Sequence, residues 1–548
     1  MSTTPPSPLR QAMTGVVGAA GMIAVVTLLS RVVGFARWLV HSWTLEGGSA
    51  TAGAYAVANQ IPNVMFEVAA GGALAGVVVP LLAAPLAKHL RQEVDRTSSA
   101  LLTWTLLALV PLGATVAVLA GPVAALVPDA AGSDVAAQRS LITYFLRVFA
   151  LQIPLYGVGV VLTGVLQAQR KFFWPAVAPL LSSLVVIASY VVFGHLAQGR
   201  QDDPAALDSL ALGWLAWGTT AGVAAMSLPL LVPVLRSGVR LRPRLHFPPG
   251  VARRARNLAA AGLGGLLAQQ VAVMSAVLLA PAGGRAGTLS IFQYAQAVYF
   301  LPYAVLAVPV ATAVFPRLAE RAGTADRAGF AALAAGSTRL VLAVSLLGTA
   351  VLVAVAPAAT AVFSLRAPLD GMTTAITLMA PGVAGYALIF HVSRTLYTLD
   401  RGRTAVLATA TGWGVVALAS VVGVRLAAPE GGDEPATLAA LALATTTGMV
   451  VAGIGLLMGL RRVAGPGALA GTVRTVSTAG GAAVLGAGLG RFASTAVLDL
   501  AGDGLLPATM AAALGAIVSA GLVIVAVLLL DRSTVEVRHW STERPRRP

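Results

Sequence analysis

The chain has 548 residues, of which 57% are hydrophobic and only 11% are charged, so it cannot supply the polar surface of several soluble domains. Its net charge of +16 does not indicate a nucleic-acid partner, because the basic residues lie in short gaps between apolar runs rather than in one basic, aromatic-rich domain. The lack of cysteine excludes disulfides and thiolate metal sites.

The apolar runs predict an all-α, polytopic membrane protein with about fourteen spanning helices, since a helix needs roughly 20 apolar residues to cross a bilayer. Turn residues and charges separate the runs. In chain order the predicted spans are 14–44, 54–86, 98–127, 140–167, 174–196, 209–235, 258–281, 288–316, 333–357, 371–398, 404–427, 436–460, 471–495 and 504–530. The first run continues past Arg31 and Arg37 without a clean cleavage site, so we interpret it as a spanning helix rather than a signal peptide.

The distribution of basic residues supports this count, because cytoplasmic loops are enriched in Lys and Arg. With a cytoplasmic N-terminus, and with Arg425, Arg474 and Arg491 near the span ends counted in the adjoining loops, 26 of the 37 Lys and Arg residues fall in cytoplasmic segments, 6 in outer loops and 5 inside helices. No predicted outer loop has more than one basic residue. The sequence therefore predicts a multi-pass protein of the cytoplasmic membrane with both termini in the cytoplasm.

A weak repeat relates predicted helices one to six to helices seven to twelve. Helix two ends in Val-Pro-Leu-Leu-Ala from Val79, and helix eight ends in Phe-Pro-Arg-Leu-Ala from Phe315, an offset of 236. Helix four ends at Arg170 and helix ten at Arg401, an offset of 231. Because six is even, both copies cross the membrane in the same direction, as in transporters with two lobes around a cavity and alternating access. The frequency of Pro in membrane helices is the simpler alternative.

The repeat predicts five parts along the chain. They are an N-lobe of helices 1–6 at 1–235, a basic cytoplasmic linker at 236–257, a C-lobe of helices 7–12 at 258–460, helices 13–14 at 461–530 and a basic cytoplasmic tail at 531–548. We interpret the linker as a segment that lies on the anionic cytoplasmic leaflet, with a gate or a substrate-docking segment as the alternative.

The sequence contains no catalytic, cofactor or metal-binding pattern, and the six His are scattered, so we do not expect an enzyme. The informative residues are ionisable groups at membrane depth, where a charge costs at least ~2.5–3.5 kcal/mol unless it faces a cavity or a partner. Arg31 lies deep in helix one, whereas Arg37 is nearer the outer interface and could snorkel. Arg147 and Arg394 are each predicted near an interface, where snorkelling is the default.

Glu67 is the only acid well inside a predicted span. It could form a structural ion pair with Arg31 or Arg37, or serve as a proton-coupling or headgroup-facing carboxylate, and both roles could hold together. A guanidinium suits phosphate because it presents a rigid fork of donors and keeps its charge. Arginines in a water-filled cavity therefore indicate an anionic headgroup, and apolar walls with a lateral opening would suit a lipid tail.

Several motifs stand out along the chain. They are Ser30-Arg31-Val32-Val33-Gly34-Phe35-Ala36-Arg37, Ala58-Asn59-Gln60-Ile61-Pro62-Asn63, Gly71-Gly72-Ala73-Leu74, Val79-Pro80, and Gln167-Ala168-Gln169-Arg170-Lys171-Phe172 with Pro175 and Pro179. In their order and spacing these motifs resemble the MurJ/MviN family. The resemblance implies a fourteen-helix flippase of the multidrug/oligosaccharidyl-lipid/polysaccharide (MOP) superfamily in the bacterial inner membrane. Such proteins move lipid II, the undecaprenyl-pyrophosphate precursor of peptidoglycan. We then expect Arg31 and Arg37, with Ser30, Asn59 and Asn63, to bind the headgroup.

The chain departs from the family pattern at several charged positions. The family usually has an acid at Gly53, an Arg pair at Phe66 and Glu67, Glu at Gly71, and an Asp-Arg pair at Gln296 and Ala297. Helices seven and eleven contain no acid for the sodium site of some members. Lipid II remains the first substrate to consider, with cell-wall synthesis proteins as partners. The alternatives are a multidrug-type exporter coupled through Glu67 and a non-transporting envelope scaffold.

Overall fold

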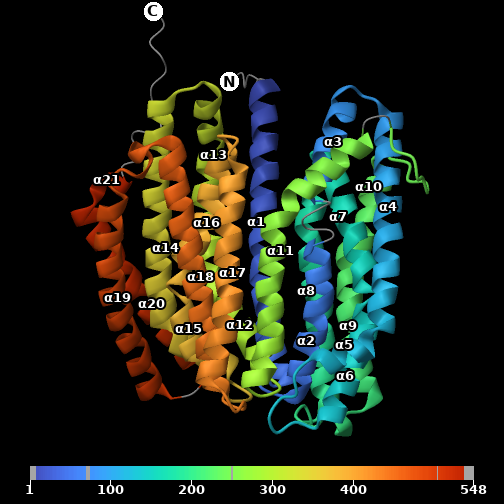
Figure 1. Ribbon diagram of the computed structural model, residues 1–548, viewed down its shortest axis with the longest axis vertical. Helices are drawn as coiled ribbons and strands as arrows, with labels where there is room; N and C mark the ends of the chain where they lie inside the picture. Colours follow the sequence, from blue (N-terminus) through green and yellow to red (C-terminus); the bar gives the residue numbers. More distant parts are fainter. Residues whose placement is uncertain (1–7, 69–74, 249–250, 503, 536–548) are drawn as a thin grey trace, which may run out of the picture. The chain divides into compact units, whose positions relative to one another are not determined.

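The computed structural model describes residues 8–68, 75–248, 251–502 and 504–535, and this part of the chain is helical and contains no strand (Figure 1). The first helices are α1 (Pro8–Leu45), α2 (Ala50–Phe66), α3 (Ala75–Ala87), α4 (Arg91–Val118), α5 (Ala120–Leu126), α6 (Val135–Phe149), α7 (Gln152–Ala168), α8 (Phe173–Ala197), α9 (Ser209–Ser227), α10 (Leu231–Arg236) and α11 (Val251–Gly283). The later helices are α12 (Thr288–Pro302), α13 (Val308–Gly323), α14 (Arg327–Phe363), α15 (Met372–Met379), α16 (Gly382–Tyr397), α17 (Gly402–Ala427), α18 (Glu434–Ala464), α19 (Thr472–Ala501), α20 (Leu505–Leu530) and α21 (Arg532–Val535).

The helices agree with the predicted membrane spans. Among the described residues, 11 helices are long and apolar enough to cross a membrane, and the bent pair α15–α16 makes up to 12. The two further predicted spans, 14–44 and 54–86, correspond to α1 and to α2 with α3, and residues 69–74 of the second lie outside the described residues. The all-α membrane fold is confirmed, and the count of about fourteen spans stays a prediction.

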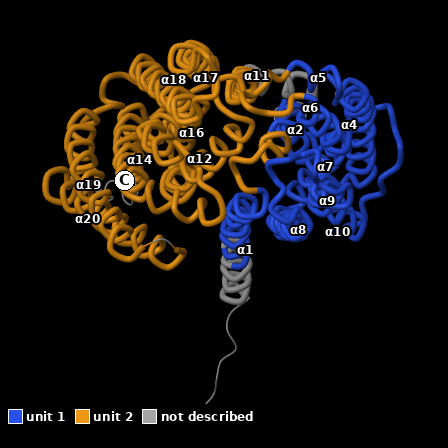
Figure 2. Tube along the Cα trace, turned by 90° about the horizontal axis from the view of Figure 1, so that it is seen from below, with its two compact units in different colours: residues 1–45, 57–126, 136–263 blue, residues 46–56, 127–135, 264–548 orange. Residues whose placement is uncertain are grey.

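The chain divides into two compact units (Figure 2). Unit 1 comprises residues 1–45, 57–126 and 136–263, and unit 2 comprises residues 46–56, 127–135 and 264–548. The main division falls inside α11, a few residues beyond the predicted start of the C-lobe at 258. The five-part division of the chain stays a prediction.

Unit 1 is built around α7, which packs against α3, α4 and α9. Its core contains fully buried aliphatic side chains from several helices, among them Val78, Leu82, Leu162, Leu166 and Val234. In the same unit α1 lies along α8, and a Cβ at Gly194 of α8 would press on Thr44. A glycine at this position therefore lets the two helices approach closely, as small residues commonly do between membrane helices.

Unit 2 is centred on α18, which packs against α15, α16 and α17. At Gly385 of α16 the backbone of Met449 is so close that a side chain would collide with it. The two helices outside the repeat, α19 and α20, pair with each other and both pack on α14. Small side chains, including Ala350 and Ala479, fill that contact. Close packing of small residues replaces the hydrophobic driving force that helices lack in lipid.

The way in which the helices end confirms the repeat. After α3 the chain turns at His89, which has a left-handed φ of 55°, and after α13 it turns at Ala325, which has a φ of 56°. These residues are 236 positions apart, the offset predicted from the sequence. In both turns the next N–H donates to the carbonyl five residues earlier, Leu90 to Pro85 at 2.9 Å and Asp326 to Arg321 at 3.1 Å. This is the Schellman geometry, which satisfies a carbonyl at the end of a helix.

Predicted helices four and ten share both their final turn and a break. Left-handed residues end them at Arg170 and Asp400, so the offset is 230 and the value of 231 predicted from the two arginines is one too large. The same offset separates the two breaks, which follow α6 and α15. At each break a threonine hydroxyl donates to a main-chain carbonyl of the preceding helix. The Thr220 hydroxyl donates to the Val148 carbonyl at 3.4 Å, and the Thr446 hydroxyl donates to the Leu378 carbonyl at 2.6 Å. The two accepting residues, Val148 and Leu378, are 230 positions apart.

A third irregularity recurs at the offset of 236. The chain enters a π-turn at Glu67 directly after α2, and a π-helix runs from Tyr303 to Ala307 directly after α12. π-Turns are rare and occur frequently at functional sites. Their recurrence marks Glu67 and Tyr303 as equivalent positions in the two copies.

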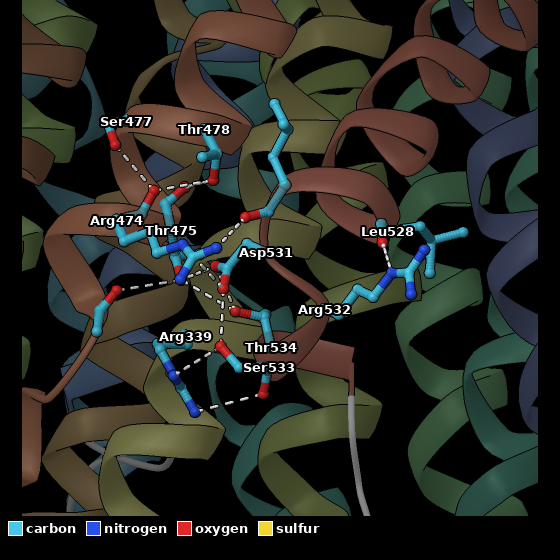
Figure 3. A network of polar contacts seen from close by, with 12 residues as sticks. Arg339, Arg474, Thr475, Ser477, Thr478, Leu528, Asp531, Arg532, Ser533 and Thr534 are labelled. Atoms are coloured by element: carbon cyan, nitrogen blue, oxygen red, sulfur yellow. Dashed lines mark hydrogen bonds and ion pairs between the residues drawn. The ribbon is translucent and has the colours of Figure 1, made fainter.

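A network of hydrogen bonds surrounds Asp531 at the C-terminal end of α20 in unit 2 (Figure 3). The buried Asp531 carboxylate accepts hydrogen bonds from three hydroxyls, those of Thr475, Thr534 and Ser533, at 2.6, 2.6 and 2.8 Å. Arg339 of α14 also donates to Ser533, at 3.3 Å. Burial raises the pKa of Asp531, but the hydrogen bonds and the charge of Arg339 outweigh burial, and the pKa lies below its usual value. The network therefore joins α14 and α19 to the end of α20.

We expect Asp531→Asn to destabilise unit 2. Hydrogen bonds to a charged group contribute about 1.5–3 kcal/mol, so the unfolding temperature in detergent should fall by roughly 5 °C. Because the pKa of Asp531 is lower in the folded than in the unfolded protein, its carboxylate stabilises the fold above the unfolded-state pKa of about 4. This stabilisation is lost as the pH falls through the folded-state pKa. The difference in unfolding temperature between wild type and variant should therefore stay constant from about pH 8 to 5 and disappear below about pH 4. Asp499→Asn, at an exposed position, is the control. An unfolding temperature unchanged by Asp531→Asn would contradict this account.

Candidate functional site

The predicted headgroup ligands of α1 lie on a helix that is only partly covered. Arg31 is exposed, and a Cβ at Gly34 would meet no atom within 4 Å. Arg31 precedes the end of α1 by 14 residues, about 21 Å at ~1.5 Å per residue, so it lies well inside the helix. Ser30 and Arg37 are half-buried, and the Arg37 guanidinium lies 5.9 Å from the centre of the Trp38 ring.

The predicted ligands of α2 lie one turn apart. Asn59 and Asn63 are both half-buried, and the Tyr156 hydroxyl of α7 donates to the Asn63 side-chain oxygen at 3.0 Å. The Tyr156 ring also packs on Phe66, with 4.4 Å between ring centres. Pro62 lies inside the helix, where it removes one backbone donor. Tyr156 thus holds the end of α2 immediately before the π-turn.

Glu67 lies in that π-turn and its side chain is exposed. Within the described ranges of the chain, Glu67 forms no ion pair with Arg31 or Arg37. The structural ion pair considered from the sequence is therefore not formed in this structure. A coupling or headgroup-facing role for Glu67 stays a prediction.

Unit 2 carries aromatic side chains at the equivalent place. Tyr386 lies 230 residues after Tyr156, and its ring contacts Tyr299 and Tyr303, the equivalents of Asn63 and Glu67, at centre distances of 6.5 and 4.8 Å. Phe300, Phe390 and Trp413 extend the cluster. One amide and one carboxylate in unit 1 are thus replaced by aromatic rings in unit 2.

The two arginines that the sequence placed near interfaces differ in their position: Arg394 lies in the last turn of α16, as expected, whereas Arg147 lies well inside its span. Arg394 of α16 is half-buried, with its guanidinium 3.7 Å from the centre of the Phe390 ring. No described residue gives it a side-chain hydrogen bond or an ion pair. Arg147 is exposed and lies 12 residues inside the 34-residue span Val135–Ala168, about 18 Å from its start. That distance exceeds the reach of an arginine side chain, so snorkelling to that end does not explain Arg147.

Comparison with known proteins assigns the chain to a family. The profile of a family described as lipid II flippase MurJ matches residues 44–500. This chain belongs to the MurJ family. A probable lipid II flippase MurJ from Rhizobium meliloti (strain 1021) is 27% identical over 303 residues, which cover 54% of this chain and 53% of that protein. The chain thus matches about half the length of this curated MurJ relative.

Solved structures show that the MurJ fold extends over nearly the whole chain. A lipid II flippase MurJ in an inward closed conformation has a TM-score of 0.69 at 16% identity, covering 94% of this chain and 99% of that chain. An inward-facing multidrug resistance MATE family transporter of the MOP superfamily has a TM-score of 0.63 at 15% identity, covering 80% of this chain and 98% of that chain. At these identities the likeness establishes the fold alone. The chain is a multi-pass membrane protein of the MurJ and MATE type.

The structure explains one departure from the MurJ pattern. Gly53, where the family usually has an acid, packs so closely on the Ala286 carbonyl in unit 2 that a side chain would collide with it. The two half-buried residues Gln296 and Ala297 occupy α12, and Gly71 lies outside the described residues. An acidic side chain at position 53 is therefore sterically incompatible with the packing seen here.

We expect Tyr156→Phe to weaken the end of α2 by removing the hydrogen bond to Asn63. A net loss of about 0.5–1.5 kcal/mol corresponds to a decrease of roughly 2–4 °C in unfolding temperature. Thermal unfolding of the detergent-solubilised protein measures it. Tyr397→Phe, on the exposed Tyr397, should leave the temperature unchanged. Equal effects of the two substitutions would show that the Tyr156 hydroxyl contributes nothing to stability.

Proposed function

We propose that the protein is a flippase that moves an undecaprenyl-pyrophosphate-linked saccharide, with lipid II as the first candidate, from the inner to the outer leaflet for peptidoglycan synthesis. The observation that carries the proposal is the family match over residues 44–500 together with exposed or half-buried guanidinium groups inside the spans of both units. The repeated architecture of the units supports alternating access, because parallel repeats build transporters of that kind.

The guanidinium groups supply the chemistry that a pyrophosphate requires. An arginine keeps its charge at any physiological pH and offers several donors to phosphate oxygens. Placing one inside a span is costly unless it meets water or an anion. We assign Arg31 and Arg37 of unit 1 to the pyrophosphate, with Ser30, Asn59 and Asn63 as polar contacts for the sugars.

Unit 2 would contribute in a different way. Arg394 offers a further guanidinium, held flat on Phe390 by a cation–π contact. The neighbouring rings of Tyr303 and Tyr386 present apolar faces with polar edges. Such faces suit the ring of a sugar, whereas a guanidinium suits phosphate. We therefore propose that Arg394 and its aromatic neighbours bind the headgroup from unit 2.

The membrane orientation and the partners follow from the same proposal. Both termini would lie in the cytoplasm of a bacterial cell, because the basic loops gather on that side. The proteins that synthesise the lipid-linked precursor and those that polymerise it would be the natural partners. The protein would catalyse no covalent step.

We expect Arg31→Ala to abolish rescue of a strain depleted of its own lipid II flippase, because the pyrophosphate would lose a cation that lies well inside α1. Arg31→Lys should retain partial rescue. Growth after depletion is the measurement, with membrane levels of each variant checked by immunoblotting. Arg425→Ala, at an exposed position on α17, is the matched control.

Full growth with Arg31→Ala would exclude Arg31 as a substrate ligand. Failure of the wild-type protein to rescue, combined with proton-dependent export of amphipathic compounds that Glu67→Gln abolishes, would replace the flippase by a multidrug-type exporter. Failure of both assays would favour an envelope scaffold.

We expect Arg394→Ala to lower the rate of lipid II translocation in proteoliposomes by about tenfold, the effect of losing roughly 1.4 kcal/mol of binding. Arg394→Lys keeps the charge but stacks less well on Phe390, so it should fall between Arg394→Ala and wild type. Arg401→Ala, in the exposed turn after α16, should translocate at the wild-type rate. A wild-type rate for Arg394→Ala would remove unit 2 from headgroup binding.

A further inference from the structure

The turn between α7 and α8 borders a hollow that the proposed transport function does not use. The hollow lies within unit 1 and has a volume of about 410 Å³. Its lining comes from three places, namely Met22 of α1, residues 170–174, and Val232, Pro233 and Arg236 of α10. Three cations contribute to this lining, Arg170, Lys171 and Arg236, and none of the lining residues is acidic.

The three cations are not neutralised by the protein. Arg170, Lys171 and Arg236 are exposed, and within residues 8–68, 75–248, 251–502 and 504–535 none of them forms an ion pair or a side-chain hydrogen bond. The backbone of the turn is satisfied without them, because the Lys171 N–H donates to the Leu166 carbonyl at 2.8 Å. The side chains are therefore available to an anion.

The rest of the hollow is apolar and aromatic. Phe172 and Trp174 are 46% and 37% exposed, and Trp174 packs edge-on against Phe173 with 5.6 Å between ring centres. Aromatic side chains beside basic residues are typical of the membrane–water boundary. Met22 and Val232 add exposed aliphatic surface. A free inorganic anion would make no use of this surface, whereas a lipid would bury it.

The repeat provides an internal comparison. The offset of 230 places Asp400 at the position of Arg170, Arg401 at that of Lys171 and Gly402 at that of Phe172. The turn of unit 2 has the same backbone geometry, but residues 400–404 combine an acid with bases and include no aromatic residue. The basic, aromatic character is therefore a property of unit 1 and not a requirement of the fold.

We propose that this hollow binds the headgroup of an anionic glycerophospholipid from the cytoplasmic leaflet. Its phosphate would lie among Arg170, Lys171 and Arg236, and the first carbons of its acyl chains would lie against Met22 and Val232. Basic pockets between membrane helices on the cytoplasmic side bind anionic headgroups in this way. Because Met22 belongs to α1, the lipid would also connect the cytoplasmic half of that helix to α8 and α10. The site is separate from Arg31 and does not depend on the transported substrate.

The test uses the full chain in phosphatidylcholine nanodiscs, titrated with phosphatidylglycerol that carries a dansyl group at the end of one acyl chain. Energy transfer to dansyl that disappears in Trp174→Phe reports on lipid at this hollow. The triple variant R170Q/K171Q/R236Q should need on the order of a hundredfold more lipid for half-maximal transfer. R401Q/R403Q/R462Q removes three exposed cations from unit 2 and should titrate like wild type. Arg31→Ala should also titrate like wild type, whatever its transport activity.

Three results would overturn the proposal. The triple variant could titrate like wild type, dansyl-labelled phosphatidylcholine could give the same transfer, or inorganic phosphate at millimolar concentration could displace the labelled lipid. Unlabelled undecaprenyl phosphate that competes far better than phosphatidylglycerol would assign the hollow to the transported lipid instead. If the triple variant does not fold, Lys171→Gln alone should weaken binding about fivefold.

Discussion

A bilayer offers no water to the backbone, so every amide or carbonyl released by a break in a helix must find its partner inside the protein. The structure meets this constraint with the same devices in both units. Hydroxyls of Thr220 and Thr446 reach carbonyls at the two breaks, and Schellman turns close the helices that follow. The irregular points recur at constant offsets, because each depends on a partner from another helix and cannot move independently of it.

On this shared backbone the two units carry different chemistry. In unit 1 Tyr156 contacts Asn63 and Phe66, whereas in unit 2 Tyr386 contacts other tyrosines. Cations occur on spanning helices of both units, but Arg394 stacks on an aromatic ring in the last turn of α16, while Arg31 lies on an exposed stretch of α1. The headgroup of the proposed substrate likewise combines phosphates with sugar rings.

The cations of unit 1 fall into two groups with different surroundings. Arg31 lies deep within α1, whereas Arg170, Lys171 and Arg236 surround a hollow next to interfacial aromatic rings. A transported anion must leave its ligands, whereas a structural lipid gains from staying. The separation of the two groups allows one unit to bind a moving headgroup and a resident headgroup without competition between them.

Hydropathy determined the membrane class and most of the helix positions, because burial in lipid depends on the apolarity of each segment alone. The repeat was visible in a few proline and arginine positions, since the irregular points impose local residue preferences. The MurJ motifs of α1 and α2 were readable for the same reason. The sequence did not reveal that Tyr156 holds Asn63, that Glu67 pairs with no arginine in the part of the chain that the structure describes, or that Arg394 stacks on Phe390. It also did not predict that residues 170–174 would meet Met22 and Arg236. Those features depend on which helix faces are brought together, and only tertiary packing decides that.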